Sequence, residues 1–373
     1  MILTWGRRTS ALASRSARDF DWYLIALAVF LSFVGILQIY SASHGTKFES
    51  LWWKQVVNLV VALGAMFLVS RVNYHSLLGR VYWMYGGSIV LLAVTFVLGS
   101  KIFGSRRWIP IFGGFNLQVS EFTKIVIVLL VARYLMDRRT EKLELPDFAK
   151  LAGLVLLPFL MVRAQPDLGT ALTYLPPLAA GVVLVGMNSR YLIVIAVIVA
   201  LVVPLGWFLL QDYQKDRILT FLDPMRDPQG KGYQVIQSKI AVGNGAVWGW
   251  GMTRGTQVQG RFLPAAHTDF IFAAFAEEHG FVGVVIALGL YYLLLMQIVQ
   301  NGQSAPDRAG TIICMGIAAM LLFHLLVNVG MVVGRMPVTG IPLPLMSYGG
   351  SSSLSVFLML GLVNNVRLQR FLI

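Results

Sequence analysis

Residues 309–334 of this 373-residue chain read AGTIICMGIAAMLLFHLLVNVGMVVG, an apolar stretch without any Asp, Glu, Lys or Arg. About 20 consecutive apolar residues, coiled as a helix, cross the hydrocarbon core of a bilayer. Backbone N–H and C=O groups in lipid need internal partners, and an α-helix supplies them. The stretch therefore predicts a membrane-spanning helix.

Nine more apolar stretches extend this prediction to the whole chain. They cover about 22–40, 51–70, 81–99, 119–136, 150–164, 171–187, 191–210, 274–299 and 352–366. Apolar residues make up 57% of the sequence and charged residues 13%, against about 45–50% and about 25% in soluble domains. This composition argues against a soluble globular protein, a disordered chain and a nucleic-acid-binding domain. We expect an all-α, polytopic membrane protein with about ten transmembrane helices in a single domain over 1–373.

Basic residues in the short connections predict the orientation of these spans. An N-terminus on the inside places fifteen of the 30 Lys and Arg residues in inner segments and seven in short outer segments. This excess predicts cytoplasmic tails at 1–21 and 367–373, and it explains a net charge of +13 without any nucleic acid. The long loop 211–273 then lies outside. Its many aromatic residues indicate a folded loop, with a short helix at about 233–242.

Charged residues at membrane depth are costly, which makes them candidates for function. Glu121 and Lys124 lie three residues apart near the start of one span, so they share a helical face. They form either a structural ion pair or a polar wall of an internal cavity. Gln165 and Asp167 flank Pro166, which ends one helix. We expect Asp167 to cap the next helix rather than to act directly in chemistry, although such a cap can shape a cavity.

The most informative cluster lies where the long loop meets the next span. Asp269 is followed there by apolar and aromatic residues, and a carboxylate in such a partly dry place suits a general base. The alternative is that Thr268 or Asp269 caps the helix. His267 is either a second acid–base group or, as we expect, an orienting hydrogen-bond partner. Glu277 shares one side of a helix with Asp269 if the helix has already begun, but the spacing matches no metal signature.

A proline- and glycine-rich segment near the C-terminus could bind substrate. It contains Ser347, Tyr348, Gly349 and Ser351 and follows the span at 309–334. Proline prevents a helix here, and glycine allows unusual backbone angles. The segment is either a re-entrant connector or a cradle for a sugar or a phosphate.

Paired arginines mark the second outer loop. Arg106 and Arg107, beside an aromatic residue, are either anchors at the membrane interface or groups that bind a pyrophosphate. From the long loop, Lys239, Arg254 and Arg261 could share that work.

Six stretches, taken together, resemble the SEDS family of bacterial cell-wall polymerases, the RodA/FtsW group. They are Ser105–Ile109, Ser120–Lys124, Gln165–Thr170, Gly232–Ala241, His267–Ala273 and Ser347–Ser352. Each alone is a weak signal, but six in family order along nearly the whole chain are specific. The forms of Gln165–Thr170 and Gly340–Pro344 are more similar to the RodA-like elongation members than to the FtsW-like division members.

The resemblance implies a peptidoglycan glycosyltransferase with ten spans. Members of the family polymerise lipid II at the outer face of the bacterial cytoplasmic membrane and release undecaprenyl pyrophosphate. Asp269 matches the essential acid of the family and would deprotonate the 4-hydroxyl of the acceptor GlcNAc. The implied partners are lipid II, the nascent glycan strand, a class B penicillin-binding protein and other membrane proteins of the elongation complex.

The chemistry of the leaving group agrees with this resemblance. A pyrophosphate departs without protonation but needs positive charge, from Arg, Lys or a divalent cation such as Mg²⁺ or Mn²⁺. No ligand set in the sequence identifies a metal site.

Two positions depart from the family pattern. Ala265 stands where the family usually has Glu, and Trp250 stands where it usually has Lys. We expect a retuned loop rather than lost activity. The alternatives to a RodA-like polymerase are an FtsW-like division polymerase, a lipid II flippase, and a scaffold for the penicillin-binding protein. Because the candidate groups gather toward the outer face, surface chemistry is favoured over transport.

Overall fold

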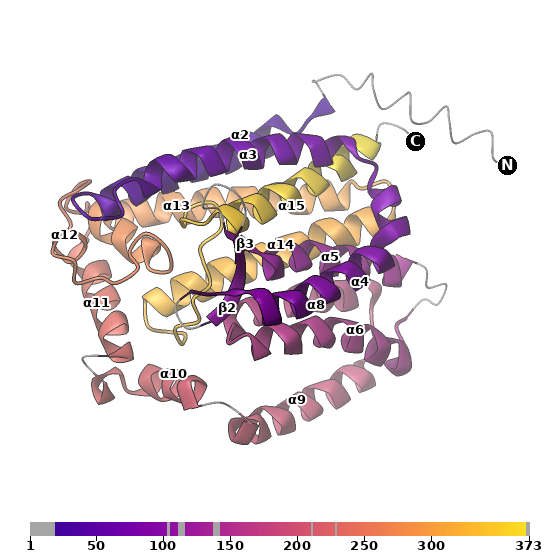
Figure 1. Ribbon diagram of the computed structural model, residues 1–373. Coiled ribbons are helices and arrows are strands. Elements are labelled where there is room, and N and C mark those ends of the chain that lie inside the picture. The colour runs from indigo at the N-terminus through magenta and orange to yellow at the C-terminus, as the bar shows by residue number, and fades with distance from the viewer. Residues whose placement is uncertain are drawn as a thin grey trace.

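The computed structural model describes residues 19–102, 105–110, 116–136, 142–209, 212–227 and 230–370. Long helices lying roughly side by side make up most of it (Figure 1). They are α2 (Trp22–Ser43), α3 (Leu51–Arg71), α4 (Tyr74–Leu98), α5 (Val119–Met136), α6 (Leu145–Ala164), α7 (Leu168–Leu172), α8 (Leu175–Val185), α9 (Ser189–Leu209), α13 (Ile271–Gln303), α14 (Arg308–Val332) and α15 (Gly350–Gln369). Each of the ten expected spans coincides with a helix, or with the pair α7 and α8.

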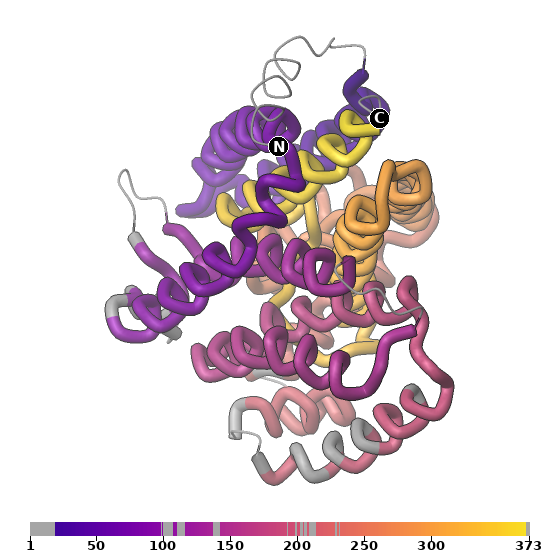
Figure 2. The backbone as a smooth tube through the Cα atoms, turned by 90° about the vertical axis from the view of Figure 1, so that its right-hand side faces the viewer, coloured from indigo at the N-terminus to yellow at the C-terminus, as the bar shows by residue number. Residues whose placement is uncertain are grey.

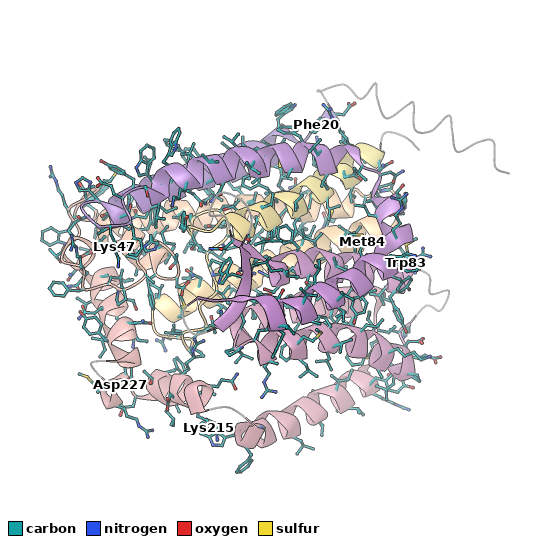
Figure 3. The ribbon with its side chains drawn as sticks, in the orientation of Figure 1. Phe20, Lys47, Trp83, Met84, Lys215 and Asp227 are labelled. Atoms are coloured by element: carbon teal, nitrogen blue, oxygen red, sulfur yellow. The ribbon has the colours of Figure 1, made fainter. Side chains whose placement is uncertain are left out.

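Seven of these helical segments are long and apolar enough to cross a membrane, within the described part of the chain. They are α2, α3, α4, α6, the α7–α8 segment, α13 and α14. Large apolar side chains on their surfaces, such as Trp83 at 86% exposed and Val183 at 78%, have no protein cover (Figure 3 labels Trp83). The chain is therefore a multi-pass membrane protein. The predicted count of ten spans is not confirmed by these seven segments, although α5, α9 and α15 are helical where expected.

Helix α5 lies inside the bundle and carries charge there. It packs against α4, α8, α14 and α15, and most of its residues are buried. Its charged side chains are Glu121, Lys124 and Arg133. A helix surrounded by protein can keep such groups where they find partners, whereas a lipid-facing helix cannot. By contrast, α9 lies at the edge of the bundle in both views (Figure 2).

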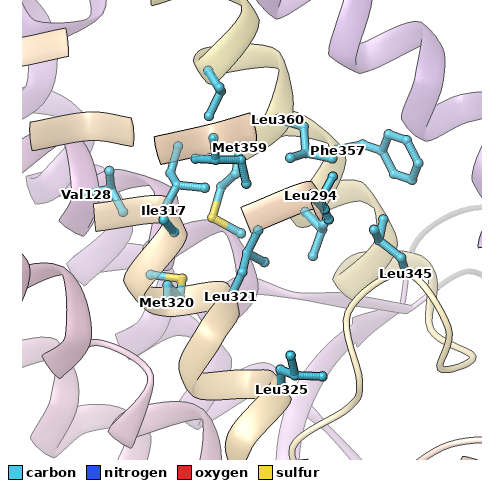
Figure 4. Packing of buried hydrophobic residues seen from close by; sticks show 14 of the residues in the cluster. Val128, Leu294, Ile317, Met320, Leu321, Leu325, Leu345, Phe357, Met359 and Leu360 are labelled. Carbon is cyan, nitrogen blue, oxygen red and sulfur yellow. The ribbon is translucent and has the colours of Figure 1, made fainter. Parts of the chain in front are cut away.

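The apolar core joins α5, α13, α14 and α15. Val128, Leu294, Ile317 and Phe357 contribute to one continuous cluster of buried side chains (Figure 4). Leu345, from the segment between α14 and α15, packs in the same cluster. The core therefore includes that non-helical segment as well as the helices.

Helices α3 and α15 pack closely through a glycine. A Cβ atom at Gly361 would lie 2.8 Å from the carbonyl oxygen of Met66 and 3.2 Å from its Cα atom. Backbone atoms cannot yield to such a contact as a flexible side chain can. The pair therefore depends on the absence of a side chain at this position.

We expect Gly361→Ala to destabilise the protein by about 1–3 kcal/mol, because it forces two helices apart in a packed core. The matched control is Gly64→Ala on α3, where an added Cβ would meet no atom within 4 Å. That change is expected to be neutral or to stabilise the helix by up to about 1 kcal/mol. Thermal unfolding in detergent measures both. Equal melting temperatures for the two variants would contradict the close packing of α3 and α15.

A small sheet, which was not predicted, accompanies the mostly helical fold. Strands β1 (Ser100–Ile102), β2 (Ser105–Pro110) and β3 (Asn116–Gln118) pair antiparallel in the order β1-β2-β3. The segment lies between two helices and carries β-branched and aromatic residues next to proline, which favours strands and turns over helix. The sheet places Arg107 on β2 and Gln118 at the end of β3, directly before α5.

The long loop 211–273 is folded, as predicted. It contains α10 (Asp212–Leu222), the 3₁₀ turn η4 (Pro224–Arg226), α11 (Lys231–Asn244) and α12 (Thr256–Gln259). Helix α11 confirms the short helix expected at 233–242. It packs against α13 and α14. Figure 3 labels Asp227, from this loop, at the end of the bundle opposite Phe20, and Lys47 lies at the same end as Asp227.

Helix α13 is interrupted at Gly280, whose φ of 64° is outside the helical range. The glycine-rich turn of the long loop lies across this break. Trp250 and Gly251 donate backbone hydrogen bonds to the carbonyls of Glu277 and Glu278, at 3.1 and 2.9 Å. On the other side, Phe281 donates to the carbonyl of Ala246 at 2.9 Å. The loop thus satisfies the backbone groups that the break leaves without helical partners.

Candidate active site

Asp269 lies in the last turn of the long loop, immediately before α13. The N-cap of α13 is Phe270, and no side chain caps this helix. The predicted alternative, in which Thr268 or Asp269 caps the helix, is therefore wrong. Asn328 on α14 donates a hydrogen bond of 3.0 Å to the carbonyl oxygen of Asp269 and fixes the backbone there. The carboxylate itself lies beside Gly340, on the segment that follows α14.

Burial raises the pKa of Asp269 to about 6. The charge of Asp167 also raises it, while the guanidinium groups of Arg217 and Arg107 oppose the rise. These four charged groups come from four separated parts of the chain. A carboxylate with a pKa near the working pH is well suited to take up a proton.

Asp167 caps α7, as the sequence predicts, and it is also part of an ion pair. Its Oδ1 accepts a hydrogen bond from the backbone N–H of Thr170 at 3.2 Å. Its Oδ2 lies 3.3 Å from Arg107 Nη1 and accepts a hydrogen bond from Gln118 Nε2 at 3.0 Å. Only 5% of the Asp167 side chain is exposed. These contacts of Asp167 hold the sheet against the break between α6 and α7, beside Asp269.

Arg107 keeps donor capacity beyond its pair with Asp167. Its second terminal nitrogen donates to the carbonyl of Pro166 at 2.9 Å. Its Nε is buried without a protein acceptor. Arg106 precedes it on β2, and the Arg106 side chain lies outside the described part of the structure.

Arg217 on α10 is the site residue that sequence reasoning missed. The charge of its guanidinium group lowers the pKa of Asp269. The same group donates a hydrogen bond to the carbonyl of Thr339 at 3.4 Å. Arg217 also lines a cavity of about 180 Å³ with Phe221 and Gln234. The amphipathic pattern of 212–222 could have indicated a helix there, but no spacing rule links that helix to Asp269.

Ser347 and Tyr348 tie the C-terminal segment to the loop that carries Asp269. The Ser347 hydroxyl donates to the carbonyl of Thr268 at 2.7 Å and accepts from the N–H of Leu343 at 2.9 Å. The N–H of Tyr348 donates to the carbonyl of His267 at 3.0 Å. These bonds make the segment a connector that positions the loop.

Ser351 and Gly349 complete this connector on its other side. The Ser351 hydroxyl accepts from the N–H of Gln118 and donates to the carbonyl of Asn116, both at 3.1 Å. The N–H of Gly349 donates to Gln55 Oε1 at 3.3 Å. The segment thus reaches the sheet, α3 and the Asp269 loop at once.

His267 packs among rings. Its imidazole lies 5.2 Å from the Phe48 ring and 6.3 Å from the Tyr348 ring, centroid to centroid. Burial lowers the pKa of His267 from its usual value, so the ring is neutral near pH 7. Ala265, where the family usually has Glu, is exposed and has a φ of 49°. A neutral ring in this position is better suited to shape the site than to supply a proton.

Glu121 and Lys124 form a buried network. Lys124 Nζ donates to Glu121 Oε1 at 2.7 Å and lies 3.2 Å from His324 Nε2 on α14. Ser355 on α15 donates to the other Glu121 oxygen at 2.9 Å. His324 Nδ1 lies 3.2 Å from the carbonyl of Pro342, so it donates there and leaves Nε2 to accept from the ammonium. Of the two alternatives for Glu121 and Lys124, a structural ion pair or a polar cavity wall, this arrangement is the structural ion pair.

Gln165 and Lys239 have packing roles. Gln165, buried at the end of α6, donates to the carbonyl of Leu92 on α4 at 3.0 Å. The aliphatic chain of Lys239 on α11 fills the space beside Gly334, where a Cβ would meet its Cε atom. Trp250, where the family usually has Lys, is half-exposed and its Nε1 donates to the carbonyl of Asn244 at 2.8 Å.

Glu277 caps the short helix α12 instead of facing Asp269 along a helix. Because α13 begins only at Ile271, Asp269 is outside it. The fully buried Glu277 carboxylate accepts hydrogen bonds from the N–H groups of Gln257 and Val258 at 2.8 and 3.2 Å. It also accepts from the Thr256 hydroxyl at 3.1 Å. Glu277 therefore holds the long loop on α13.

We expect Glu277→Gln to destabilise the protein by about 2 kcal/mol, because charge-assisted hydrogen bonds to two backbone donors are lost. Limited proteolysis of the 250–260 region should accelerate, and the melting temperature should fall. Glu144→Gln is the control, since Glu144 is an exposed N-cap whose side chain makes no capping bond. Identical behaviour of the two variants would show that Glu277 does not anchor the loop.

Within the described residues, no group of three or more His, Cys, Asp or Glu side chains could hold a metal ion. Asp269 and Asp167 stand instead beside guanidinium groups. The guanidinium groups of Arg107 and Arg217 supply positive charge at this site.

Comparison with known proteins places this arrangement in a family. The model of the FtsW/RodA/SpoVE family, described as cell cycle proteins, matches residues 19–371. The peptidoglycan glycosyltransferase RodA of Treponema pallidum is 33% identical over 95% of this chain and 99% of its own length. The peptidoglycan glycosyltransferase MrdB of Escherichia coli is 37% identical over 93% of this chain and 92% of its own.

Comparison with solved structures indicates the same family. A chain of a peptidoglycan synthase complex, described as coordinating polymerisation and crosslinking, superimposes with a TM-score of 0.82 and 37% identity, covering 94% of this chain and 98% of that one. The rod shape determining protein RodA of Thermus thermophilus gives 0.71 and 32% identity with the same coverage. The chain therefore belongs to the FtsW/RodA/SpoVE family, the SEDS proteins.

Proposed function

We propose that this chain is a peptidoglycan glycosyltransferase that polymerises lipid II into glycan strands for cell elongation and releases undecaprenyl pyrophosphate. The observation that carries the proposal is Asp269, a partly buried carboxylate that caps no helix and has a pKa of about 6. The names of the relatives, peptidoglycan glycosyltransferases RodA and MrdB, support the reaction class.

In the proposed mechanism Asp269 is the general base. The 4-hydroxyl oxygen of the acceptor GlcNAc attacks the anomeric carbon of the donor, and Asp269 takes the hydroxyl proton. The bond between that carbon and the undecaprenyl pyrophosphate breaks, and the pyrophosphate leaves with the electron pair. Arg107 and Arg217, the two guanidinium groups near Asp269, are placed to stabilise its negative charge.

A divalent cation was an expectation from the chemistry of the leaving group. The described residues offer no cluster of three ligands for Mg²⁺ or Mn²⁺, and the two carboxylates near the site face arginines. This donor set does not fit a resident metal. No step of the proposed mechanism depends on one.

The proposed membrane setting follows from the distribution of basic residues. Both termini lie in the cytoplasm, and Asp269 with the long loop lies at the outer face of the bacterial cytoplasmic membrane. We propose that a class B penicillin-binding protein, which crosslinks the strands, binds this chain together with other membrane proteins of the elongation complex. The synthase complex among the similar structures supports a crosslinking partner.

In the deciding experiment, labelled lipid II is added to the purified protein together with its transpeptidase partner. Formation of glycan polymer on a gel is the expected result. The flippase alternative predicts instead that lipid II crosses vesicle membranes without being polymerised. Transport without polymer would overturn the proposal. A flippase path would also need charged groups along its length, whereas Asp269, Asp167, Arg107 and Arg217 gather in one place.

A further inference from the structure

Asn328 on α14 joins two segments of the site through one amide group. Its side chain is fully buried, and its Nδ2 donates hydrogen bonds to the carbonyl of Asp269 at 3.0 Å and to the carbonyl of Ile341 at 2.8 Å. The amide nitrogen of asparagine carries two hydrogens, so each carbonyl can take one. The loop that carries Asp269 and the segment that follows α14 are thereby tied to the same atom of a buried helix.

The segment at Ile341 borders the Asp269 carboxylate. A Cβ atom at Gly340 would lie 3.6 Å from Asp269 Oδ2. The carbonyl of Thr339, one residue earlier, accepts a hydrogen bond from Arg217 at 3.4 Å. The base and a guanidinium group that opposes the rise of its pKa therefore meet the same short segment. A shift of this segment relative to Asp269 would change the charge and the solvent around the carboxylate.

The Asn328 side chain is oriented by its two donors and not by its oxygen. Asn328 Oδ1 is buried and has no hydrogen-bond partner among the described residues. A buried acceptor without a partner is costly, and native proteins keep few of them. We would expect an asparagine that only stabilises the core to pair both ends of its amide.

Asn365 on α15 is an example of such a structural amide. It is also fully buried, and its Nδ2 donates to the carbonyls of Ser70, at 2.7 Å, and Val72. Its Oδ1 accepts from the backbone N–H of Tyr74 at 3.1 Å, so both ends of the amide are paired. This side chain holds the turn between α3 and α4, about 22 Å along α15 from Gly350. The unpaired oxygen distinguishes the amide at the site from this one.

We propose that Asn328 is a positioning residue for glycan polymerisation, which fixes the main chain of Asp269 against the segment at Ile341 and so sets where the base carboxylate stands. This role rests on the proposed function of Asp269 as the general base. A displacement of about 1 Å near the reacting groups can lower a rate about 10²-fold. Asn328 needs no contact with the substrate, because it acts through Asp269.

The test compares Asn328→Ser with Asn365→Ser, in full-length protein with its transpeptidase partner and labelled lipid II. Each change removes a buried amide that joins two carbonyls, and the serine hydroxyl can bond within its own helix. Asn328→Leu and Asn365→Leu keep the size of the side chain and so separate the loss of donors from the creation of a cavity. The readouts are the melting temperature, kcat, KM and the profile of kcat/KM against pH.

We expect both serine variants to melt at a lower temperature, but only Asn328→Ser to lower kcat, by about 10²-fold and with little change in KM. The acid limb of its profile should move from an apparent pKa of about 6 toward 3.8, the ordinary value of Asp269, because a loosened loop admits water to the carboxylate. Folded Asn365→Ser should keep the kcat and the acid limb of the wild type. Each leucine variant should behave like its serine counterpart.

Equal losses of kcat in the Asn328 and Asn365 variants, with unmoved acid limbs, would make Asn328 a structural residue and overturn the proposal. A wild-type kcat in Asn328→Ser would also overturn it. Hydrogen–deuterium exchange gives an answer that does not depend on activity, since Asn328→Ser should speed exchange in residues 265–270 and Asn365→Ser should not. Unchanged exchange there would refute the role of Asn328, whereas wild-type protein that makes no polymer would refute the proposed function.

Discussion

Replacing Asp269 by Asn is expected to lower the rate of glycan polymerisation by about 10²–10⁴-fold, the usual contribution of a general base. The amide keeps the size of the side chain but cannot accept a proton from the acceptor hydroxyl. The measurement is the initial rate of polymer formation from labelled lipid II. Glu49→Gln is the control, because Glu49 is an exposed carboxylate in a loop at the same end of the bundle and makes only a 3.7 Å contact with His44.

The same variant should be more stable than the wild type at neutral pH. The pKa of Asp269 is raised to about 6 in the folded protein, above its ordinary value of 3.8. The stabilising contribution of its proton is thus fully present below pH 3.8 and is lost as the pH rises through 6. The neutral amide of the variant mimics the protonated form, so Asp269→Asn should gain about 1–3 kcal/mol at pH 8. A folded, stabilised and inactive variant separates lost chemistry from lost structure.

The wild-type rate should also fall on the acid side with an apparent pKa of about 6, because a protonated Asp269 is no base. A profile of kcat/KM against pH measures this limb. Normal polymerisation by Asp269→Asn, or a rate independent of pH between 5 and 8, would show that another group takes the proton.

The second large effect concerns Arg107. We expect Arg107→Lys to lower the polymerisation rate by about 10²-fold, the cost of removing one donor that stabilises developing charge. Lysine keeps the charge but cannot bridge the Asp167 carboxylate and the Pro166 carbonyl, or supply a further donor such as the buried Nε. The assay is again polymer formation, with substrate concentration varied.

Arg226→Lys is the matched control for this change, since Arg226 is an exposed arginine of the same long loop. A structural role of Arg107 alone predicts a lower melting temperature and a proportionate loss of active protein. A role at the pyrophosphate predicts a lower kcat in protein that is still folded. If Arg107→Lys polymerised at the wild-type rate, the leaving-group charge would have to be stabilised elsewhere.

Much of the fold could be predicted because a membrane-spanning helix requires a long apolar stretch in the sequence. The apolar stretches mark helices, and ten of them coincide with helical segments. Helices α2, α13 and α14 follow this rule best. Helix α5 follows it less well, because it carries charged side chains whose partners are protein groups such as Ser355 rather than lipid. Hydropathy counts the charges of Glu121 and Lys124 in full, although these two side chains pair with each other in the folded protein.

The site was predicted in part for a related reason. Asp269 stands beside aromatic residues in the sequence itself, and Asp167 follows a proline, so local pattern indicates both. Arg217 reaches Asp269 only because α10 packs against α11 and η4 in the folded loop. Glu277 was grouped with Asp269 by helical periodicity, which fails because the helix begins two residues too late. A contact between a loop and a distant helix cannot be predicted from the spacing of residues along the sequence.

The break in α13 at Gly280 has a mechanical consequence. The turn at 246–251 hydrogen-bonds to both sides of the break, to carbonyls before Gly280 and to N–H groups after it. It therefore acts as a splint across the bend, and changing the bend angle would cost backbone hydrogen bonds on at least one side. The short arm of α13 begins one residue after Phe270, so the splint also fixes the position of Asp269 relative to the long arm of α13. In the mechanism that we propose, the base is thereby held at a constant distance from that arm by backbone hydrogen bonds rather than by side chains.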